Sequence, residues 1–103
     1  MQRKKDNLVV KTKLSVNIKS LKILGNEKIP EDCGIFRLMI DKRNIRIVWD
    51  RMSITDVNDA KQVFQDIKTK GMIPYEVSVD GKTSVNEMKK FDANVDEVVF
   101  KPI

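Results

Sequence analysis

The stretch GIFRLMIDKRNIRIVWD, residues 34–50, decides the fold. Apolar and polar residues alternate on both sides of a four-residue turn, 41–44, which is the pattern of two antiparallel strands joined as a hairpin. We predict that one face of this hairpin lies on the core, formed by Phe36, Leu38, Ile40, Ile45, Ile47 and Trp49. The opposite face then carries Arg37, Met39, Arg46 and Val48.

A helix is predicted directly after the hairpin. Apolar residues recur with the i, i+3, i+4, i+7 spacing of a helix buried on one side. This apolar stripe consists of Ala60, Val63, Phe64 and Ile67. We expect Asp56 to be the N-cap, with Asp59 in the capping-box position, and Gly71 to follow the last turn.

Shorter patterned stretches predict further strands around these elements. Residues 8–18 alternate apolar residues with lysines and other polar residues, which indicates one strand with a lysine-rich outer face. Residues 75–79 alternate in the same way, and residues 97–101 read as a last strand before Pro102. Between these two, the spacing of apolar residues by three over 85–91 is typical of a short helical turn.

Together these elements predict an α+β fold, with a mixed or antiparallel sheet of four to five strands packed on one main helix. The order of elements is compatible with a ubiquitin-like β-grasp, although alternation does not give the order of strands in the sheet. A chain of 103 residues forms one small domain. We expect a basic N-terminal arm and strand at 1–28 and a single α+β domain at 29–103.

The net charge of +5 is concentrated in the N-terminal quarter of the chain. Residues 1–28 carry eight Lys or Arg and two acidic residues, so 8 − 2 = +6. Residues 29–103 carry twelve basic and thirteen acidic residues, so 12 − 13 = −1. A basic arm on a near-neutral body is suited to lie on an acidic protein surface or on a nucleic acid.

Residues 48–102 contain a series of short motifs. They are Trp49-Asp50, Ala60 with Phe64, Lys70-Gly71, Tyr75 with Val77, and Phe91-Asp92 ahead of a Val-rich strand that ends at Pro102. This series resembles a group of small, mostly uncharacterised proteins of bacteriophages and other mobile elements. The resemblance implies a viral or mobile-element accessory protein and implies no activity. The chain lacks the glycine-ending tail of many members, and its N-terminal segment lies outside the resemblance.

The composition excludes several kinds of catalytic and metal site. The chain has no histidine, which removes the commonest general base and every Ser-His or Cys-His arrangement. With a single cysteine, zinc sites of the Cys/His type are also impossible. That cysteine, Cys33, follows Glu31 and Asp32, whose charges should raise the pKa of its thiol and make it less reactive.

Two groups of carboxylates also have a structural explanation. Asp92, Asn94 and Asp96 match the start of an EF-hand loop, but Glu97 stands where the glycine of that loop belongs. We therefore predict a turn held by Asp and Asn side chains. The pair Asp56 and Asp59 is explained by helix capping, so we expect no catalytic residue, metal or cofactor.

These observations predict a non-enzymatic structural or accessory protein of a phage or mobile element that acts through protein–protein contacts in an assembly. The arm would add a strand to a partner protein or to a neighbouring copy of the chain. The alternative is a small basic nucleic-acid-binding protein or regulator. In either case the candidate contact residues are Arg3, Lys4, Lys5, Lys11, Lys13, Lys19, Arg37, Lys42, Arg43 and Arg46.

The sequence predicts no membrane partner and shows no evident small-molecule substrate. No stretch approaches the ~18 apolar residues that a membrane span needs. Residues 8–10, Leu-Val-Val, are too few for the apolar core of a signal peptide. We therefore expect the protein in the host cytoplasm or in the virion.

Overall fold

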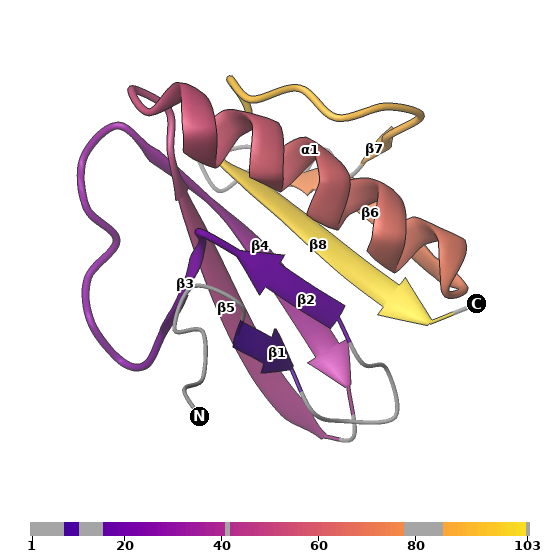
Figure 1. The fold of residues 1–103 in the computed structure, drawn as a ribbon. Helices are drawn as coiled ribbons and strands as arrows, with labels where there is room; N and C mark the ends of the chain where they lie inside the picture. Colours follow the sequence, from indigo (N-terminus) through magenta and orange to yellow (C-terminus); the bar gives the residue numbers. More distant parts are fainter. Residues whose placement is uncertain (1–7, 11–15, 41, 78–85, 103) are drawn as a thin grey trace, which may run out of the picture.

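The computed structural model describes residues 8–10, 16–40, 42–77 and 86–102 (Figure 1). Eight strands and one helix lie within these ranges. They are β1 (Leu8–Val10), β2 (Val16–Lys19), β3 (Lys22–Leu24), β4 (Cys33–Ile40), β5 (Arg43–Asp50), α1 (Ile54–Thr69), β6 (Met72–Val77), β7 (Asn86–Glu87) and β8 (Glu97–Pro102).

Six of the strands form one mixed sheet in the order β3-β5-β4-β8-β6-β7. Neighbouring strands are antiparallel except β4 and β8, which run parallel. The predicted α+β class and the mixed sheet are confirmed, but the predicted number of four to five strands is wrong. β3 has three residues and β7 has two, which is too few to produce a recognisable alternation in the sequence.

The core lies between this sheet and a layer made of α1 and the small sheet β1-β2 (Figure 1). The four residues of the predicted helix stripe are all buried, as expected. Val16, Ile18 and Leu21, at most 2% exposed, belong to the same core cluster. Residues 16–21 therefore share one core with the domain predicted at 29–103.

The prediction of a single strand over residues 8–18 is wrong. β1 and β2 pair antiparallel, with Val10 opposite Val16, so the chain reverses its direction between them. Residues 11–15 lie outside the described residues. Alternation has the same period in one long strand and in the two strands of a hairpin, so it does not locate a reversal.

The N-terminus of α1 lies ahead of the predicted one. Ser53 is the N-cap, and its hydroxyl accepts a hydrogen bond from the backbone N–H of Asp56 at 3.1 Å. The carboxylate of Asp56 instead accepts from the backbone N–H of Asp50 at 2.9 Å and from the hydroxyl of Ser20 at 2.8 Å. Ser and Asp are comparably good caps, so the sequence does not decide between them. The other end is as predicted, because Gly71 follows the helix with a φ of 98°.

β4 and β5 form the predicted hairpin, and its core face is as predicted except at Ile40, whose side chain lies outside what the structure describes. The pairs on the helix side are Gly34–Trp49, Phe36–Ile47 and Leu38–Ile45. The connection is shorter than the predicted four-residue turn, because β5 already begins at Arg43, opposite Ile40. Lys42 takes a left-handed φ of 64°, as two-residue hairpin connections require, and Asp41 lies outside the described residues.

β6 and β8 confirm the strands predicted after the helix. β6 begins earlier than predicted, at Met72, and residues 78–79 lie outside the described residues. The short helical turn predicted over 85–91 is wrong, because Asn86 and Glu87 pair with β6 as strand β7; residue 85 is not described. Met88 and Phe91 nevertheless both pack on the core, from the irregular segment that follows β7.

An aromatic cluster occupies the centre of the core. The ring centroids of Phe36 and Trp49 lie 4.7 Å apart, and Phe91 and Phe100 lie 5.7 and 5.6 Å from Phe36. Phe64 of α1 closes the cluster at 6.4 Å from Phe36. Such pairs stabilise a core beyond the area that they bury. The cluster joins the hairpin, the helix, β8 and the segment that precedes β8.

Gly34 makes room for the largest of these side chains. A Cβ atom at Gly34 would lie 2.2 Å from Cζ2 and 2.6 Å from Cε2 of Trp49, far inside van der Waals contact. The indole is fully buried and has no open side into which it can move. The glycine is therefore required by packing against β5.

Gly34→Ala is expected to lower the free energy of unfolding by about 3 kcal/mol, because the core must be rearranged around Trp49. The measurement is urea denaturation followed by the fluorescence of Trp49, the single tryptophan. Gly25→Ala is the control, since its Cβ would meet only a side-chain oxygen of Glu27 at 3.3 Å. We expect that variant within about 0.5 kcal/mol of the wild type. Equal stability of the two variants would contradict the contact.

Candidate interaction surface

The face of the main sheet opposite α1, here called the outer face, carries two of the candidate contact residues, Arg37 and Arg46. Paired residues in a sheet project to the same side, so the register gives the neighbours of each side chain. One row of outward-facing side chains crosses all six strands. It consists of Leu24, Arg46, Arg37, Val99, Tyr75 and Glu87. The outer face therefore combines cations with apolar side chains.

β6 contributes apolar side chains to the outer face, as do Ile35 and Val48 of the hairpin. Each outward position of this strand is apolar and half-buried: Ile73, Tyr75 and Val77. Of its inward positions, Met72 and Pro74 are buried toward the helix side and Glu76 is half-buried. An apolar outward side distinguishes β6 from a strand with one fully solvated polar face.

Arg37 and Arg46 lie directly opposite each other on β4 and β5, and both make contacts within the chain. Nε of Arg37 donates to Oε2 of Glu97 on β8 at 2.5 Å. Nη2 of Arg46 donates to the backbone carbonyls of Gly25 and Glu27, the latter at 2.8 Å. From the sequence, both arginines were expected to be available for contacts with a partner. In the structure, both guanidinium groups instead make contacts that hold the sheet and its connections.

The other candidate cations lie in different places. Lys42 and Arg43 are exposed at the end of the hairpin. Lys19 belongs to β2, in the layer on the helix side of the sheet, so it does not extend the outer face. The remaining candidates lie outside the described residues: Arg3, Lys4, Lys5, Lys11 and Lys13. The structure therefore brings together Arg37 with Arg46, and Lys42 with Arg43.

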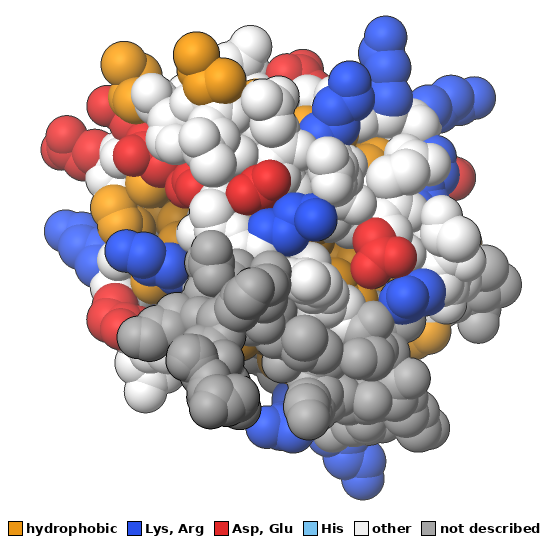
Figure 2. Space-filling view, in the orientation of Figure 1, with side chains coloured by type: hydrophobic (Ala, Val, Ile, Leu, Met, Phe, Trp, Pro, Cys, Tyr) orange, Lys and Arg blue, Asp and Glu red, His pale blue; other side chains and the backbone are white. Residues whose placement is uncertain are grey.

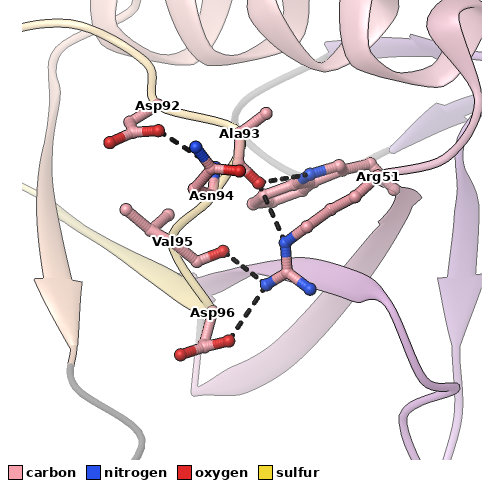
Figure 3. A network of polar contacts seen from close by, with 7 residues as sticks. Arg51, Asp92, Ala93, Asn94, Val95 and Asp96 are labelled. Carbon is pink, nitrogen blue, oxygen red and sulfur yellow. Dashed lines mark hydrogen bonds and ion pairs between the residues drawn. The ribbon is translucent and has the colours of Figure 1, made fainter.

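Arg51 has a structural role that the sequence did not indicate. Its guanidinium donates to the backbone carbonyl of Ala93 at 3.0 Å, to that of Val95 at 2.8 Å and to the carboxylate of Asp96 at 3.0 Å (Figure 3). The loop before β8 is thus fastened to the end of β5. Asp92 accepts from the backbone N–H of Asn94 at 3.0 Å, which confirms the predicted turn held by side chains.

Arg51→Met is expected to lower the free energy of unfolding by about 2–3 kcal/mol, because it keeps the apolar stem and removes three charge-assisted hydrogen bonds. Hydrogen exchange of the amides in 93–96 should accelerate as well. The control is Asp96→Asn, which removes only the ion pair of a half-exposed carboxylate and should cost at most about 1 kcal/mol. An equal effect of the two variants, measured by urea denaturation, would contradict the role of the carbonyl contacts.

The carboxylates at the start of α1 connect the helix to the N-terminal part of the chain. The backbone N–H of Ser20 donates to Asp59 at 3.2 Å, while its hydroxyl donates to Asp56. Both carboxylates thus accept hydrogen bonds from the turn that follows β2. These hydrogen bonds explain why the two carboxylates lie together, without any acid–base chemistry. The sequence could not show that their donor, Ser20, lies more than thirty residues away.

Cys33 begins β4 and is half-buried. Burial raises the pKa of its thiol, and the carboxylate of Asp50, opposite it on β5, raises it further. Asp56 and Asp32 add smaller effects in the same direction, and Arg51 opposes them. The predicted direction is confirmed, with Asp32 a minor cause and with burial and Asp50 the principal ones.

Asp50→Asn is expected to shift the pH profile of Cys33 alkylation to lower pH. The thiolate is the reactive form, and removing the carboxylate removes one cause of the raised pKa. The measurement is the rate of reaction with iodoacetamide as a function of pH, followed by mass spectrometry. Glu87→Gln removes a distant carboxylate and should leave the profile unchanged. A profile that Asp50→Asn does not move would contradict the assigned cause.

An open depression of about 440 Å³ lies where the segment after β7 meets β6. Its lining consists of Glu76, Glu87, Met88, Lys89, Lys90, Phe91, Asp92 and Ala93. Carboxylates and lysines occur together around it, so it favours no ligand of a single charge.

The chain matches no protein-family model, no curated protein and no solved structure. Within the residues that the structure describes, no helix has both the length and the apolar character needed to cross a bilayer.

Proposed function

We propose that this chain is a non-enzymatic structural or accessory protein of a phage or other mobile element, acting through protein–protein contacts in an assembly. The observation that carries the proposal is the exposure of large hydrophobic side chains on a molecule in which three of the four described arginines, Arg37, Arg46 and Arg51, donate to groups of the chain itself. Met52 and Ile54 are 77% and 79% exposed, and Met39 is 45% exposed. Exposed apolar side chains that gather with charged ones are typical of protein contact sites.

Three arginines make hydrogen bonds within the chain, and this makes nucleic-acid binding the less favoured of the two functions. Such binding depends on cations that can replace counterions on phosphates. Arg37, Arg46 and Arg51 already donate to groups of the chain itself. Stacking of bases needs open aromatic faces, whereas Nζ of Lys101 lies 5.7 Å from the ring of Tyr75. The alternative is a small basic nucleic-acid-binding protein or regulator, and the exposed Lys42 and Arg43 favour it.

The roles of the polar groups support a non-enzymatic protein. The carboxylates of Asp56 and Asp59 hold the turn at Ser20, and Arg51 holds the loop before β8. The raised pKa of Cys33 keeps its thiol protonated and weakly nucleophilic. Each of these groups thus has a structural explanation.

The strand order supports a finer assignment of the fold. The five strands β5-β4-β8-β6-β7 hold the parallel pair β4 and β8 at their centre, and α1 connects β5 to β6. We propose that this part is β-grasp-like, with β3 and the β1-β2 hairpin as additions. The motifs of residues 48–102 lie within it, and their resemblance to phage and mobile-element proteins supports the proposed origin.

Light scattering during size-exclusion chromatography separates the two candidate functions. We expect the purified chain to associate without DNA at about 50 mM salt, and its mass to be unaffected by a short mixed-sequence duplex. A monomer that shifts only when DNA is present, and loses the shift at about 500 mM salt, would contradict protein assembly and favour phosphate binding.

A further inference from the structure

Met52 and Ile54 are the most exposed large hydrophobic residues among those that the structure describes. They flank the N-cap Ser53, at positions N′ and N1 of α1. An apolar residue at N′ commonly packs against the residue at N4, which is Val57 here. Met52 is 77% exposed, so it does not serve that purpose. Helix capping leaves the exposure of this apolar pair unexplained.

Carboxylates surround the apolar pair. Asp50 lies opposite Cys33, and the carbonyl of Asp32 accepts from the backbone N–H of Arg51 at 2.9 Å, so both lie at the turn into α1. Figure 2 shows hydrophobic side chains beside a group of acidic ones at the upper left, over the start of α1. We call this surface the turn end. It consists of Glu31, Asp32, Asp50, Met52 and Ile54, all exposed.

The opposite end of the same hairpin has the opposite charge. Lys42 and Arg43 are exposed there beside Met39, and Lys101 is exposed one position beyond the last pair of β4 with β8. We call this surface the tip end; it consists of Met39, Lys42, Arg43 and Lys101. The sequence adds the carboxylate of Asp41, which lies outside the described residues, so the net charge is 3 − 1 = +2.

The two ends cannot meet within one molecule. They are held apart by the paired strands β4 and β5, whose eight residues each span about 24 Å at ~3.3–3.4 Å per residue. Each end combines exposed apolar side chains with a net charge, and the two net charges have opposite signs. Surfaces with complementary charge around an apolar centre are suited to bind each other.

We infer that the turn end of one copy docks on the tip end of a second copy of this chain. Met52 and Ile54 would pack against Met39, and the carboxylates of the turn end would face Lys42, Arg43 and Lys101. The inference rests on the proposed function and names the partner and the contact surfaces of that assembly.

The contact is heterologous, because it joins two different surfaces. Each added copy therefore keeps one end available, and assembly continues until the rotation closes a ring or gives a filament. A two-fold dimer through either end would place charges of the same sign against each other. The charge pattern thus favours head-to-tail assembly over a symmetric dimer.

Paired charge reversals test this arrangement on the full chain. Lys42→Glu with Arg43→Glu makes both ends acidic, and Glu31→Lys with Asp32→Lys makes both ends basic. A lysine is tolerated at the left-handed φ of 60° of Asp32, because Lys19 and Lys42 adopt similar angles. By sedimentation velocity at about 50 mM salt, we expect each variant alone to remain monomeric and the equimolar mixture to associate.

Two further variants define the contact. Met52→Ser with Ile54→Ser removes the apolar pair and should weaken association at least about tenfold. Lys89→Glu with Lys90→Glu has the same change of charge as the tip-end variant but lies at neither end, so it should associate like the wild type. Restoration by mixing also excludes misfolding as the cause of the loss, because mixing would not refold either variant.

The outcomes separate this inference from the proposed function. A wild-type chain that remains monomeric at low salt, or a mixture that fails to associate, overturns the end-to-end contact. Association that persists in all the end variants overturns it as well, and leaves protein assembly standing through another surface. A chain that changes mass only with DNA overturns the proposed function itself.

Discussion

The contact between the indole of Trp49 and the backbone of Gly34 is the constraint on which the core depends. The indole lies across β4. The centroid of its ring is 4.7 Å from that of Phe36 and 5.1 Å from that of Phe91. Its Nε1–H points to the backbone carbonyl of Ala93 at 3.4 Å, and the guanidinium of Arg51 donates to the same oxygen. One side chain thus couples the hairpin to the loop that leads into β8. β8, which follows this loop, pairs parallel with β4.

The outer face shows how adjacent like charges are accommodated in a small sheet. Arg37 and Arg46 are direct cross-strand neighbours, an arrangement that is destabilising when both charges are left alone. Arg37 turns toward Glu97 on one side, and Arg46 turns toward the carbonyls of Gly25 and Glu27 on the other. The first contact crosses the parallel pair, and the second holds the connection that leaves β3. Two of the four cations of the hairpin, Arg37 and Arg46, therefore make contacts within the chain, whereas Lys42 and Arg43 are exposed.

The spacing of apolar residues predicted those elements that depend only on residues close together in the sequence. The stripe from Ala60 to Ile67 and the core face of the hairpin both follow from the periods of helix and strand, and both are confirmed. The prediction of Asp56 as the N-cap is wrong: Ser53 caps the helix, and the carboxylate of Asp56 accepts from Ser20, a residue distant in sequence. The reversal between β1 and β2 was invisible because alternation continues through it. The contacts of Arg37, Arg46 and Arg51 join segments far apart in the chain, so no local pattern could reveal them.

The edges of the main sheet limit the ways in which this molecule can bind others. Its edge strands are β3, with three residues, and β7, with two, and short edge strands offer little backbone for an added strand. The described part of the predicted arm is also occupied, since β1 pairs with β2 and β2 lies on the core. Strand addition to this sheet is therefore a poor route to assembly. What remains on the described surface are side chains, and the two most exposed large apolar ones, Met52 and Ile54, lie at the end of the hairpin where the charge is negative.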